Sequence, residues 1–530
     1  MKLRPHLAPF AAYLVLTGIM TAPFVSLRNL GGCIICDSDP GLVMWTISWV
    51  NHALMTQPLD LFAANAFYPS AGSLSFSEHA FGLAVLVFPW SWFSANPVVP
   101  YNLLFLLTYF ASAAGMYALC WYYTRSRAAS FIGGLIFGFC FFRAHHFGHL
   151  TLIANQWFPF LILIFHKLRE RFAWWPAALW VALFVLQCLT NWYNAAFITL
   201  ILTWIMAADF IRQRWNLRAF GRFALCGVLA AVLILPFYIP YSRHPAPDDY
   251  SENEIFSADL MTYFDPPFNT MLGRYLENSD RWIWGEKSIF IGFLPFLMAI
   301  AGILAGRGRC LIWTYCSLGA IALVLSLGPT GLNLGGWMPI AHLYDLLPPI
   351  GKLRATARFS VIVVFCVAVL AALFLSRIRH AKWWLPPVTL IVLLEFYPVG
   401  FDWNPATVAA FEPRPVDIWL REQNTPESGK VVLELPDYSG TDLWFRESAY
   451  MLYSTQHWMK LVNGYTRYYP ADYLERFRLY SRFPAEEAIE AMKSIGVDYV
   501  VVHSEEYDFS GHPLLVAALG SDWIFELATD

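Results

Sequence analysis

Charged residues are scarce in this chain. Only 14% of its 530 residues are Asp, Glu, Lys or Arg, whereas 58% are hydrophobic and the mean hydropathy is +0.47. A soluble protein would carry about 25% charged residues. The sequence also lacks the basic stripe that nucleic-acid-binding proteins present, so nucleic acid is not an expected partner. The scarcity of charge therefore predicts an integral membrane protein.

Cysteine is also sparse. The nine Cys residues are scattered, mostly inside apolar runs, and this pattern excludes a disulfide framework. Cys33 and Cys36 form a C-x-x-C pair, but no thioredoxin-like βαβ pattern surrounds it. A local disulfide and two idle thiols therefore both stay open. No internal repeat and no low-complexity segment is apparent.

The apolar residues gather in runs close to the ~20 residues that one membrane crossing requires. The first run follows Lys2 and Arg4 and lacks a convincing cleavage site, which favours a retained helix over a signal peptide. Many of the 23 Trp residues flank the runs, as aromatic residues do at a membrane surface. The runs cover residues 8–26, 78–94, 101–123, 128–143, 150–166, 174–189, 195–210, 223–241, 288–305, 311–328, 357–376 and 383–400.

Every second connection between these runs is rich in Lys or Arg, which predicts that these connections and the N-terminus are cytoplasmic. Runs 78–94 and 101–123 together join an outer to an inner connection, which requires an odd number of crossings. We therefore expect 78–94 to be re-entrant or to lie along the surface, which leaves 11 crossings. The outer connections are 27–77, 144–149, 190–194, 242–287, 329–356 and everything after residue 400.

Residues 401–530 differ in character from the rest. Charge rises, KVVLEL (430–435) and DYVVVH (498–503) read as buried strands, and PVDIWLREQ and PAEEAIEAMKSIG read as helices, the second ending at Gly496. The sequence thus predicts a mainly α fold. Residues 1–400 form a polytopic transmembrane bundle of about 11–12 hydrophobic helices, and residues 401–530 form a small soluble extracytoplasmic α/β domain.

Few polar groups are expected on the outer face, and ionisable groups in a membrane protein are costly and usually functional. A cleft among them could hold a phosphate with the arginines and deprotonate a hydroxyl with an Asp. The candidates are Asp37, Asp39, Glu78, His79, Arg143, His145, His146, His149, Asn155, Gln156, Lys352, Arg354 and Arg358.

Each candidate also has a structural interpretation. Asp39 with Pro40 could simply begin a helix. Three of the histidines, His145, His146 and His149, have near-helical spacing and could bind zinc, but no matching acid or Cys lies nearby in the sequence. Arg354 and Arg358, four residues apart, could anchor their helix at the membrane surface. In the tail, Asn463, Tyr465, Tyr468 and Tyr469 could stack on a sugar or serve ordinary packing and an Asn-Gly turn.

The layout resembles that of the GT-C glycosyltransferases, in which a first helix and a long acidic outer loop precede many helices and a soluble tail. Several strings also look like those of bacterial polytopic proteins called YfhO-like. They are DPGLVMWTISWV, NAFYPSAGSLSFSEHAFG, NPVVPYNLL, the pair HHFGHL and NQWFP, LRATARF, LVNGYTRYYP and GVDYVVVH.

The resemblance implies a glycosyltransferase of a bacterial inner membrane that uses a polyprenyl-phosphate-type sugar donor. The acceptor would be an extracytoplasmic glycan, lipid or protein, and the transfer would invert the anomeric centre. The base would be Asp39, with Asp37 as second choice. The lipid phosphate would be bound by Arg354 and Arg358, with Arg143 as a third candidate. Glu78, His79 and the histidines would line the sugar pocket, with Gln156 beside them.

A divalent cation, Mg²⁺ or Mn²⁺, is left open, since Asp37, Asp39 and Glu78 could hold one only if they fold together. Two other functions also remain. One is a transporter or flippase of a lipid-linked glycan, although the sequence lacks the internal repeat typical of transporters. The other is an inactive GT-C-like scaffold.

Overall fold

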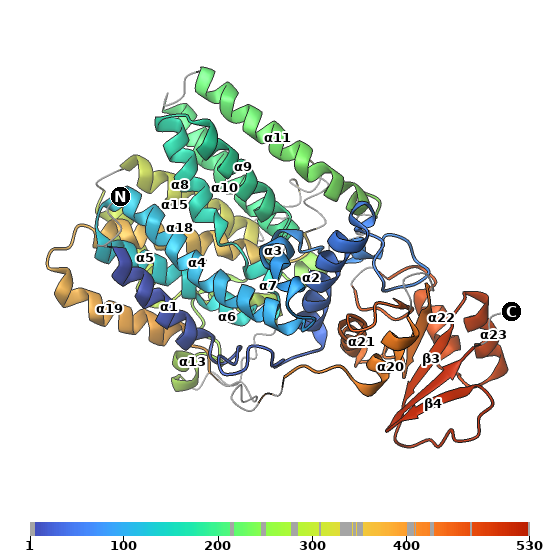
Figure 1. Ribbon diagram of the computed structural model, residues 1–530. Coiled ribbons are helices and arrows are strands. Elements are labelled where there is room, and N and C mark those ends of the chain that lie inside the picture. Colours follow the sequence, from blue (N-terminus) through green and yellow to red (C-terminus); the bar gives the residue numbers. More distant parts are fainter. Residues whose placement is uncertain are drawn as a thin grey trace. The chain divides into compact units, whose positions relative to one another are not determined.

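The structure is a computed structural model (Figure 1). Its contacts divide the chain into a first unit of residues 1–27, 105–147 and 152–405 and a second unit of residues 28–104, 148–151 and 406–530. Lys352, Tyr468 and much of the predicted outer loop 329–356 lie outside the described residues. The structure describes residues 6–212, 217–244, 251–276, 285–306, 309–328, 342, 346, 353–399, 408, 410–424, 429–466 and 469–527.

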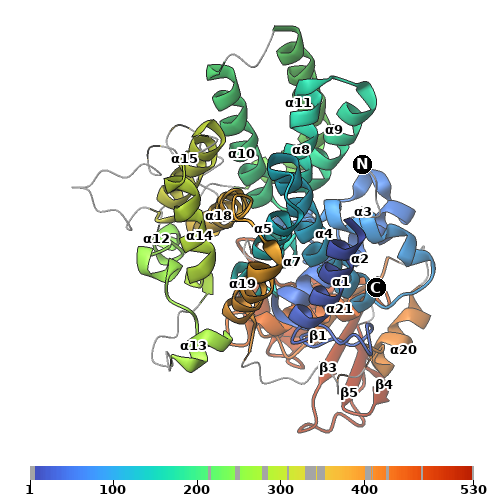
Figure 2. The same cartoon turned by 90° about the vertical axis from the view of Figure 1, so that its left-hand side faces the viewer.

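The first unit is a bundle of apolar helices. α18 lies beside α5, α14 and α15 (Figure 2), and glycines of α5 let neighbouring helices approach closely. A Cβ atom on Gly134 would lie 2.1 Å from the Tyr13 hydroxyl. The main helices are α1 (Leu7–Thr21), α4 (Val98–Thr124, from residue 105 onward), α5 (Arg127–Phe139), α6 (Phe141–His145), α8 (Trp157–Glu170), α9 (Trp174–Cys188), α10 (Trp192–Ile211), α11 (Leu217–Ser242), α14 (Phe293–Leu304), α15 (Arg309–Ser326), α18 (Ser360–Leu375) and α19 (Ala381–Phe396).

The lengths and burial of these helices fit a membrane bundle. Among the described residues, six helices are long and apolar enough to cross a membrane, and five more apolar helices are shorter. In the most apolar 18-residue stretch of residues 356–375, 89% of the residues are buried. The helix α18 within this range is apolar on all sides, as a central helix must be. In the corresponding stretch of residues 220–242, only 17% of the residues are buried. The apolar surface of α11 therefore suits contact with lipid. The predicted mainly α, polytopic bundle is confirmed.

Two segments that the sequence predicts on the outer side, 78–94 and 27–77, both contain helices. Run 78–94 forms α3 (Phe81–Val87) and the 3₁₀ helix η4 (Phe88–Trp92), which together rise about 18 Å. This is less than the ~30 Å of a bilayer core. The predicted connection 27–77 contains α2 (Ser38–Thr56). A helix does begin at Asp39 and Pro40, as their structural interpretation allowed, but its length was not predicted. α2 packs on α21 (Glu447–Ser454). Polar residues that suit this contact interrupt the apolar pattern of α2.

The second unit contains a five-stranded sheet in the order β2-β1-β3-β5-β4. β1 pairs in parallel with β2 and β3, whereas β5 pairs antiparallel with β3 and β4. The predicted strands and helices are confirmed, including the helix that ends before Gly496. The elements are β1 (Val431–Leu435), β2 (Lys460–Leu461), β3 (Tyr499–His503), β4 (Leu515–Leu519), β5 (Asp522–Glu526), α20 (Pro415–Gln423), α22 (Tyr473–Tyr480) and α23 (Glu486–Ser494).

A buried network of charges ties α20 to this sheet. Arg414 contacts Asp417 at 2.6 Å and Glu434 at 2.9 Å. His503 Nε2 lies 2.8 Å from Glu434 and His503 Nδ1 lies 2.7 Å from Asp522. Burial alone would lower the pKa of His503, but its hydrogen bonds to Asp522 and Glu434 outweigh burial and raise that pKa. The imidazole is therefore held as a cation between two carboxylates.

This network predicts a pH-dependent stability for the sheet. A raised folded-state pKa means that the contribution of His503 is complete below its unfolded pKa of about 6.5 and is lost as pH rises through the folded value. We therefore expect β3 and β5 to lose amide protection as pH rises above 6.5. Hydrogen exchange on the full-length protein, corrected for the intrinsic exchange rate, measures this. His503→Gln should flatten the profile, whereas His512→Gln should not. Equal protection across pH 6–9 in the native protein would contradict the expectation.

Candidate functional site

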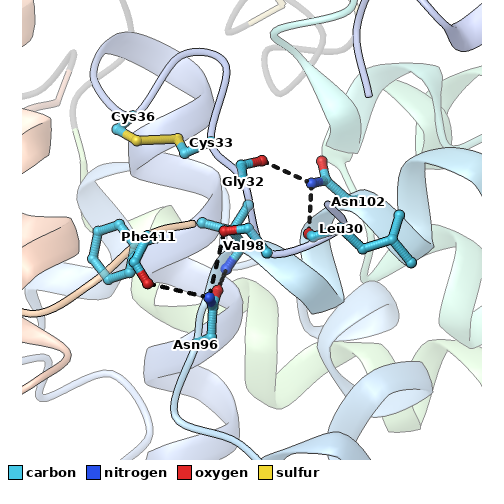
Figure 3. Close-up of a disulfide and its surroundings, with 9 residues drawn as sticks. Leu30, Gly32, Cys33, Cys36, Asn96, Val98, Asn102 and Phe411 are labelled. Atoms are coloured by element: carbon cyan, nitrogen blue, oxygen red, sulfur yellow. Dashed lines mark hydrogen bonds between the residues drawn. A yellow bond between two sulfur atoms is a disulfide. The ribbon is translucent and has the colours of Figure 1, made fainter. Parts of the chain in front are cut away.

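The segment that leads into α2 is fixed from several sides within the second unit (Figure 3). Cys33 and Cys36 form a disulfide. Asn102 Nδ2 donates to the carbonyls of residues 30 and 32, at 2.9 and 3.3 Å. Asn96 Nδ2 donates to the carbonyl of Phe411 at 3.3 Å, and the Phe411 amide donates to the carbonyl of residue 31. The first turn of α2 therefore begins from a braced loop.

Two carboxylates occupy the start of α2. Asp37 precedes the helix without capping it through its side chain, and Asp39 lies in the first turn. A negative charge in this turn is favoured by the helix dipole. Burial raises the pKa of Asp37, although a backbone hydrogen bond and Arg446 act against it. Gly41 is needed here, because a Cβ atom would lie 2.5 Å from the Cys36 carbonyl oxygen.

Asp39 is oriented by two side chains from distant parts of the sequence. The Tyr465 hydroxyl donates to Asp39 Oδ1 at 3.0 Å, and His149 Nε2 lies 2.9 Å from Asp39 Oδ2. Burial, together with the adjacent Asp39 charge, raises the pKa of Tyr465. The hydroxyl therefore stays protonated and acts as the hydrogen-bond donor to Asp39. The Asp39 side chain is 37% exposed. It is thus a positioned carboxylate that a solvent-borne hydroxyl can reach.

An exposed aromatic ring lies next to this carboxylate. Trp444 stacks on Tyr465 with ring centroids 4.9 Å apart and is 42% exposed. Asn463, another residue of the predicted sugar-binding set, lies in the packed interior instead. Asn463 is fully buried and bonds to Glu434 and Glu447. The second unit therefore combines an oriented acid with one accessible aromatic surface.

The adjacent candidates Glu78 and His79 lie in the second unit and have different surroundings. Glu78 is half-buried. His79 is buried, and its Nδ1 accepts a hydrogen bond from the Phe81 amide at 3.1 Å, where α3 begins. Burial lowers the pKa of His79 to about 3, so the ring is neutral. His79 supports the helix start rather than lining an open pocket.

The first unit holds a separate cluster of charges around Glu286. Arg358 Nε donates to Glu286 Oε2 at 2.9 Å and its Nη2 donates to Oε1, so the pair is bidentate. His146 Nε2 lies 2.9 Å from the same Oε2, and His146 Nδ1 lies 2.9 Å from the Phe142 carbonyl. All three residues are buried. Arg358 also lies 4.5 Å from the centre of the Tyr193 ring.

The charge of this cluster follows from its contacts. Burial would raise the pKa of Glu286, but Arg358 and His146 hold that pKa well below its usual range, so Glu286 is ionised. Both ring nitrogens of His146 lie within hydrogen-bond distance of an oxygen acceptor. Two basic side chains, Arg358 and His146, therefore flank one carboxylate. A second arginine, Arg354, is less buried, 3.7 Å from Glu252.

Two other predicted site residues, Arg143 and Gln156, are buried inside the helix bundle of the first unit. Arg143 has no exposed surface and donates to the carbonyls of residues 137 and 153, to Ser112 and to Asn155. Gln156 is also fully buried, 3.4 Å from Thr108. These contacts hold both side chains inside the bundle, and their predicted part in substrate binding stays a prediction. His145 is half-buried, with its ring 5.2 Å from that of His146.

The near-helical spacing of His145, His146 and His149 predicts that they lie together and leaves a zinc site open. His146 joins Glu286 and Arg358, whereas His149 joins Asp39. Across the described residues, no group of three or more His, Cys, Asp or Glu side chains could hold a metal ion. Asp37, Asp39 and Glu78, which are all described, do not form such a group.

A family of known sequences matches the chain. The family model described as "Domain of unknown function (DUF6311)" covers residues 11–397. The chain is a DUF6311 protein. No curated protein matches it.

This DUF6311 protein also has a similar solved structure. It is the cryo-EM structure of a mutant of the arabinofuranosyltransferase AftD from Mycobacteria, with a TM-score of 0.57 and 14% sequence identity. The match covers 95% of the present chain but 37% of that protein. At this identity the likeness concerns the fold, which is therefore GT-C-like, as the sequence predicts. Similarity to YfhO-like proteins stays a prediction.

Sequence reasoning missed two members of these clusters. Glu286 lies in a loop whose preceding residues, 277–284, fall outside the described part of the chain, and no motif singled it out. The only available signal was the need of Arg358 for a buried anion. Trp444 was missed because it lies outside the Asn463–Tyr469 string that attracted attention.

The Glu286 cluster predicts a large loss of stability when its anion is removed. Glu286→Gln leaves Arg358 and His146 without their shared carboxylate, and breaking such a buried pair costs about 3–5 kcal/mol. We expect a clearly lower thermal midpoint by scanning fluorimetry in detergent. The matched control is Glu254→Gln, at an exposed position of α12 (Ser251–Ile255), which should change little. Equal midpoints for both variants would refute a structural role for the cluster.

Proposed function

We propose that this DUF6311 protein is a membrane glycosyltransferase that moves a sugar from a polyprenyl-phosphate-type donor to an extracytoplasmic acceptor, with inversion. The observation that carries the proposal is Asp39, a partly exposed carboxylate oriented by Tyr465 and His149 at the start of α2. The GT-C-like fold supports the same reaction class. The acceptor is a hydroxyl on a glycan, lipid or protein.

In the proposed reaction Asp39 accepts the proton of the acceptor hydroxyl. The hydroxyl oxygen then forms a bond to the anomeric carbon of the donor, while the bond from that carbon to the phosphate oxygen breaks. The electron pair of that bond leaves with the lipid phosphate. Tyr465 and His149 keep the Asp39 carboxylate in one orientation, so that little rearrangement is required when the proton moves.

The growing negative charge on the lipid phosphate requires a cationic environment. The Glu286 cluster supports this role because two basic side chains, Arg358 and His146, are held in fixed, buried positions around one carboxylate. Arg354, which is less buried than Arg358, is the side chain we assign to direct phosphate contact. Arg358 and His146 act as a fixed basic background that Glu286 holds in place.

The first test of the proposal removes the base. Asp39→Asn keeps the shape of the side chain but cannot accept the proton, and loss of a general base typically costs about 10²–10⁴-fold in rate. We expect a loss of this size in transfer from labelled lipid-linked sugars by protein reconstituted in membranes. Asp60→Asn, at an exposed carboxylate of the same unit, is the matched control. Full transfer by the Asp39 variant would remove Asp39 from the mechanism.

The same assay separates the alternatives. A native protein that moves intact lipid-linked glycan between leaflets without bond cleavage would be a flippase. A protein that does neither would be an inactive scaffold. Neither alternative explains why Tyr465 and His149 orient a carboxylate that stays accessible to solvent.

We also propose that the second unit is extracytoplasmic and the N-terminus cytoplasmic. The Cys33–Cys36 disulfide supports this orientation, because disulfides persist in oxidising compartments. Cys310, an exposed thiol at the start of α15, follows a connection that the sequence predicts to be cytoplasmic.

This orientation is tested by labelling with a membrane-impermeant maleimide in bacterial spheroplasts. Cys33 and Cys36 should react without permeabilisation, but only after a reductant has opened the disulfide. Cys310 should react only after permeabilisation. Cys310→Ser removes the second signal and serves as the control. Reaction of Cys310 in intact spheroplasts would reverse the proposed orientation.

A further inference from the structure

A cavity of about 250 Å³ opens in the first unit, away from every residue assigned above. Its lining comes from α4, α8, α10 and α15. The lining residues lie near the ends of α4, α8 and α10 and the beginning of α15. The connections at these helix ends are the basic ones that the sequence predicts to be cytoplasmic. The cavity is thus a polar site at that end of the bundle.

A chain of hydrogen bonds forms one wall of the cavity. The Tyr123 hydroxyl lies 2.6 Å from His166 Nε2 and 2.7 Å from the Tyr315 hydroxyl. Tyr122 stacks on His166, with ring centroids 5.6 Å apart. His166 and Tyr315 are buried. Side chains from three helices therefore hold this wall in one arrangement.

Two arginines add positive charge to the lining. Arg169 pairs with Asp209, and the side chains of this pair are 13% and 4% exposed. Arg212 donates to the carbonyl of Cys310 at 2.6 Å, a neutral partner that leaves its charge uncompensated by that contact. Two guanidinium groups and one carboxylate, Asp209, belong to the lining, and a second carboxylate, Glu170, accepts a hydrogen bond from the lining residue Tyr122. Arg212 is therefore the lining cation whose printed partner is neutral.

Simple packing does not account for such a site. Ionisable side chains inside a helical bundle are costly, and they usually mark a binding site or a pathway. The tyrosine hydroxyls are engaged with Glu170, His166 and each other, so the arginines supply the donors of this cavity. Guanidinium donors match the oxygens of a phosphate group.

We propose that this cavity binds the phosphate of an anionic headgroup, with Arg212 as its main contact and Arg169 beside it. The volume is below the about 300–1,000 Å³ of pockets for drug-sized ligands, so only a small group can enter. Basic pockets between membrane helices on the cytoplasmic side commonly take lipid headgroups. The site is independent of the sugar transfer proposed above.

Binding is tested on the purified full-length protein in detergent, without any activity assay. Three probes are added separately: phosphatidic acid, diacylglycerol with the same acyl chains, and inorganic phosphate. Native mass spectrometry counts the bound lipid, and the thermal midpoint reports stabilisation. We expect phosphatidic acid to bind and to stabilise the protein, and diacylglycerol to do neither.

The variants locate the site. Arg212→Gln should weaken phosphatidic acid binding about fivefold, the effect of one cation near a membrane surface. The matched control is Arg218→Gln, an exposed arginine outside the cavity, which should leave binding unchanged. The double variant Arg169→Gln with Asp209→Asn removes the ion pair without leaving a lone buried charge, and it should also weaken binding. Thermal midpoints without ligand show that each variant is folded.

The possible results separate the sources of the phosphate. Stabilisation by phosphatidic acid alone identifies a lipid headgroup. Stabilisation by inorganic phosphate, abolished by Arg212→Gln, identifies a soluble phosphate ligand and preserves the site. Equal binding by the Arg212 and Arg218 variants, or binding of diacylglycerol as tight as phosphatidic acid, would overturn the proposal.

Discussion

The cost of holding a charge in a largely apolar chain is the constraint on which the rest of this structure depends. An isolated buried charge is very unfavourable unless hydrogen bonds or an opposite charge stabilise it. Glu286 shows the consequence most clearly, since its carboxylate receives Arg358 in bidentate fashion and His146 at 2.9 Å. The Arg169–Asp209 pair and the Arg414 network follow the same rule. Charges therefore occur in compact groups, and each group ties together segments that are far apart in the sequence.

Much of the fold could be predicted because it depends on local patterns. The long apolar runs indicated the bundle, and the short strands and capped helices of the tail matched β1, β3, α20 and α23. The prediction failed where the partner is another part of the chain. α2 is a buried helix with polar positions that suit its contact with α21, so its sequence reads as a loop when lipid contact is assumed. The β4–β5 hairpin was missed because most of its residues are half-buried or exposed, whereas β1 and β3 are mostly buried and form continuous apolar runs.

The candidate site could be predicted by residue type better than by grouping. Asp39, His146, His149 and Arg358 were all singled out, yet the spacing of the histidines suggested a shared metal site. In the structure, His146 serves Glu286 and His149 serves Asp39. A three-residue spacing decides which side chains share a helix face only while the helix continues, and α6 ends at His145. The partners Glu286 and Tyr465 lie more than a hundred residues away, and no local pattern connects them to the histidines.

Arg143 and Arg358 show why burial alone does not define function. Both guanidinium groups are nearly inaccessible, and each makes several hydrogen bonds. Arg143 donates to two backbone carbonyls, Ser112 and Asn155, all of them neutral, so its contacts close a turn between two helices. Arg358 instead shares the Glu286 carboxylate with His146, so its surroundings are ionisable side chains from distant parts of the chain. Preorganised ionisable groups can stabilise charge that develops on a ligand, which neutral backbone contacts do less well. This difference in surroundings is why the proposed reaction assigns the cationic role to the Glu286 cluster and not to Arg143.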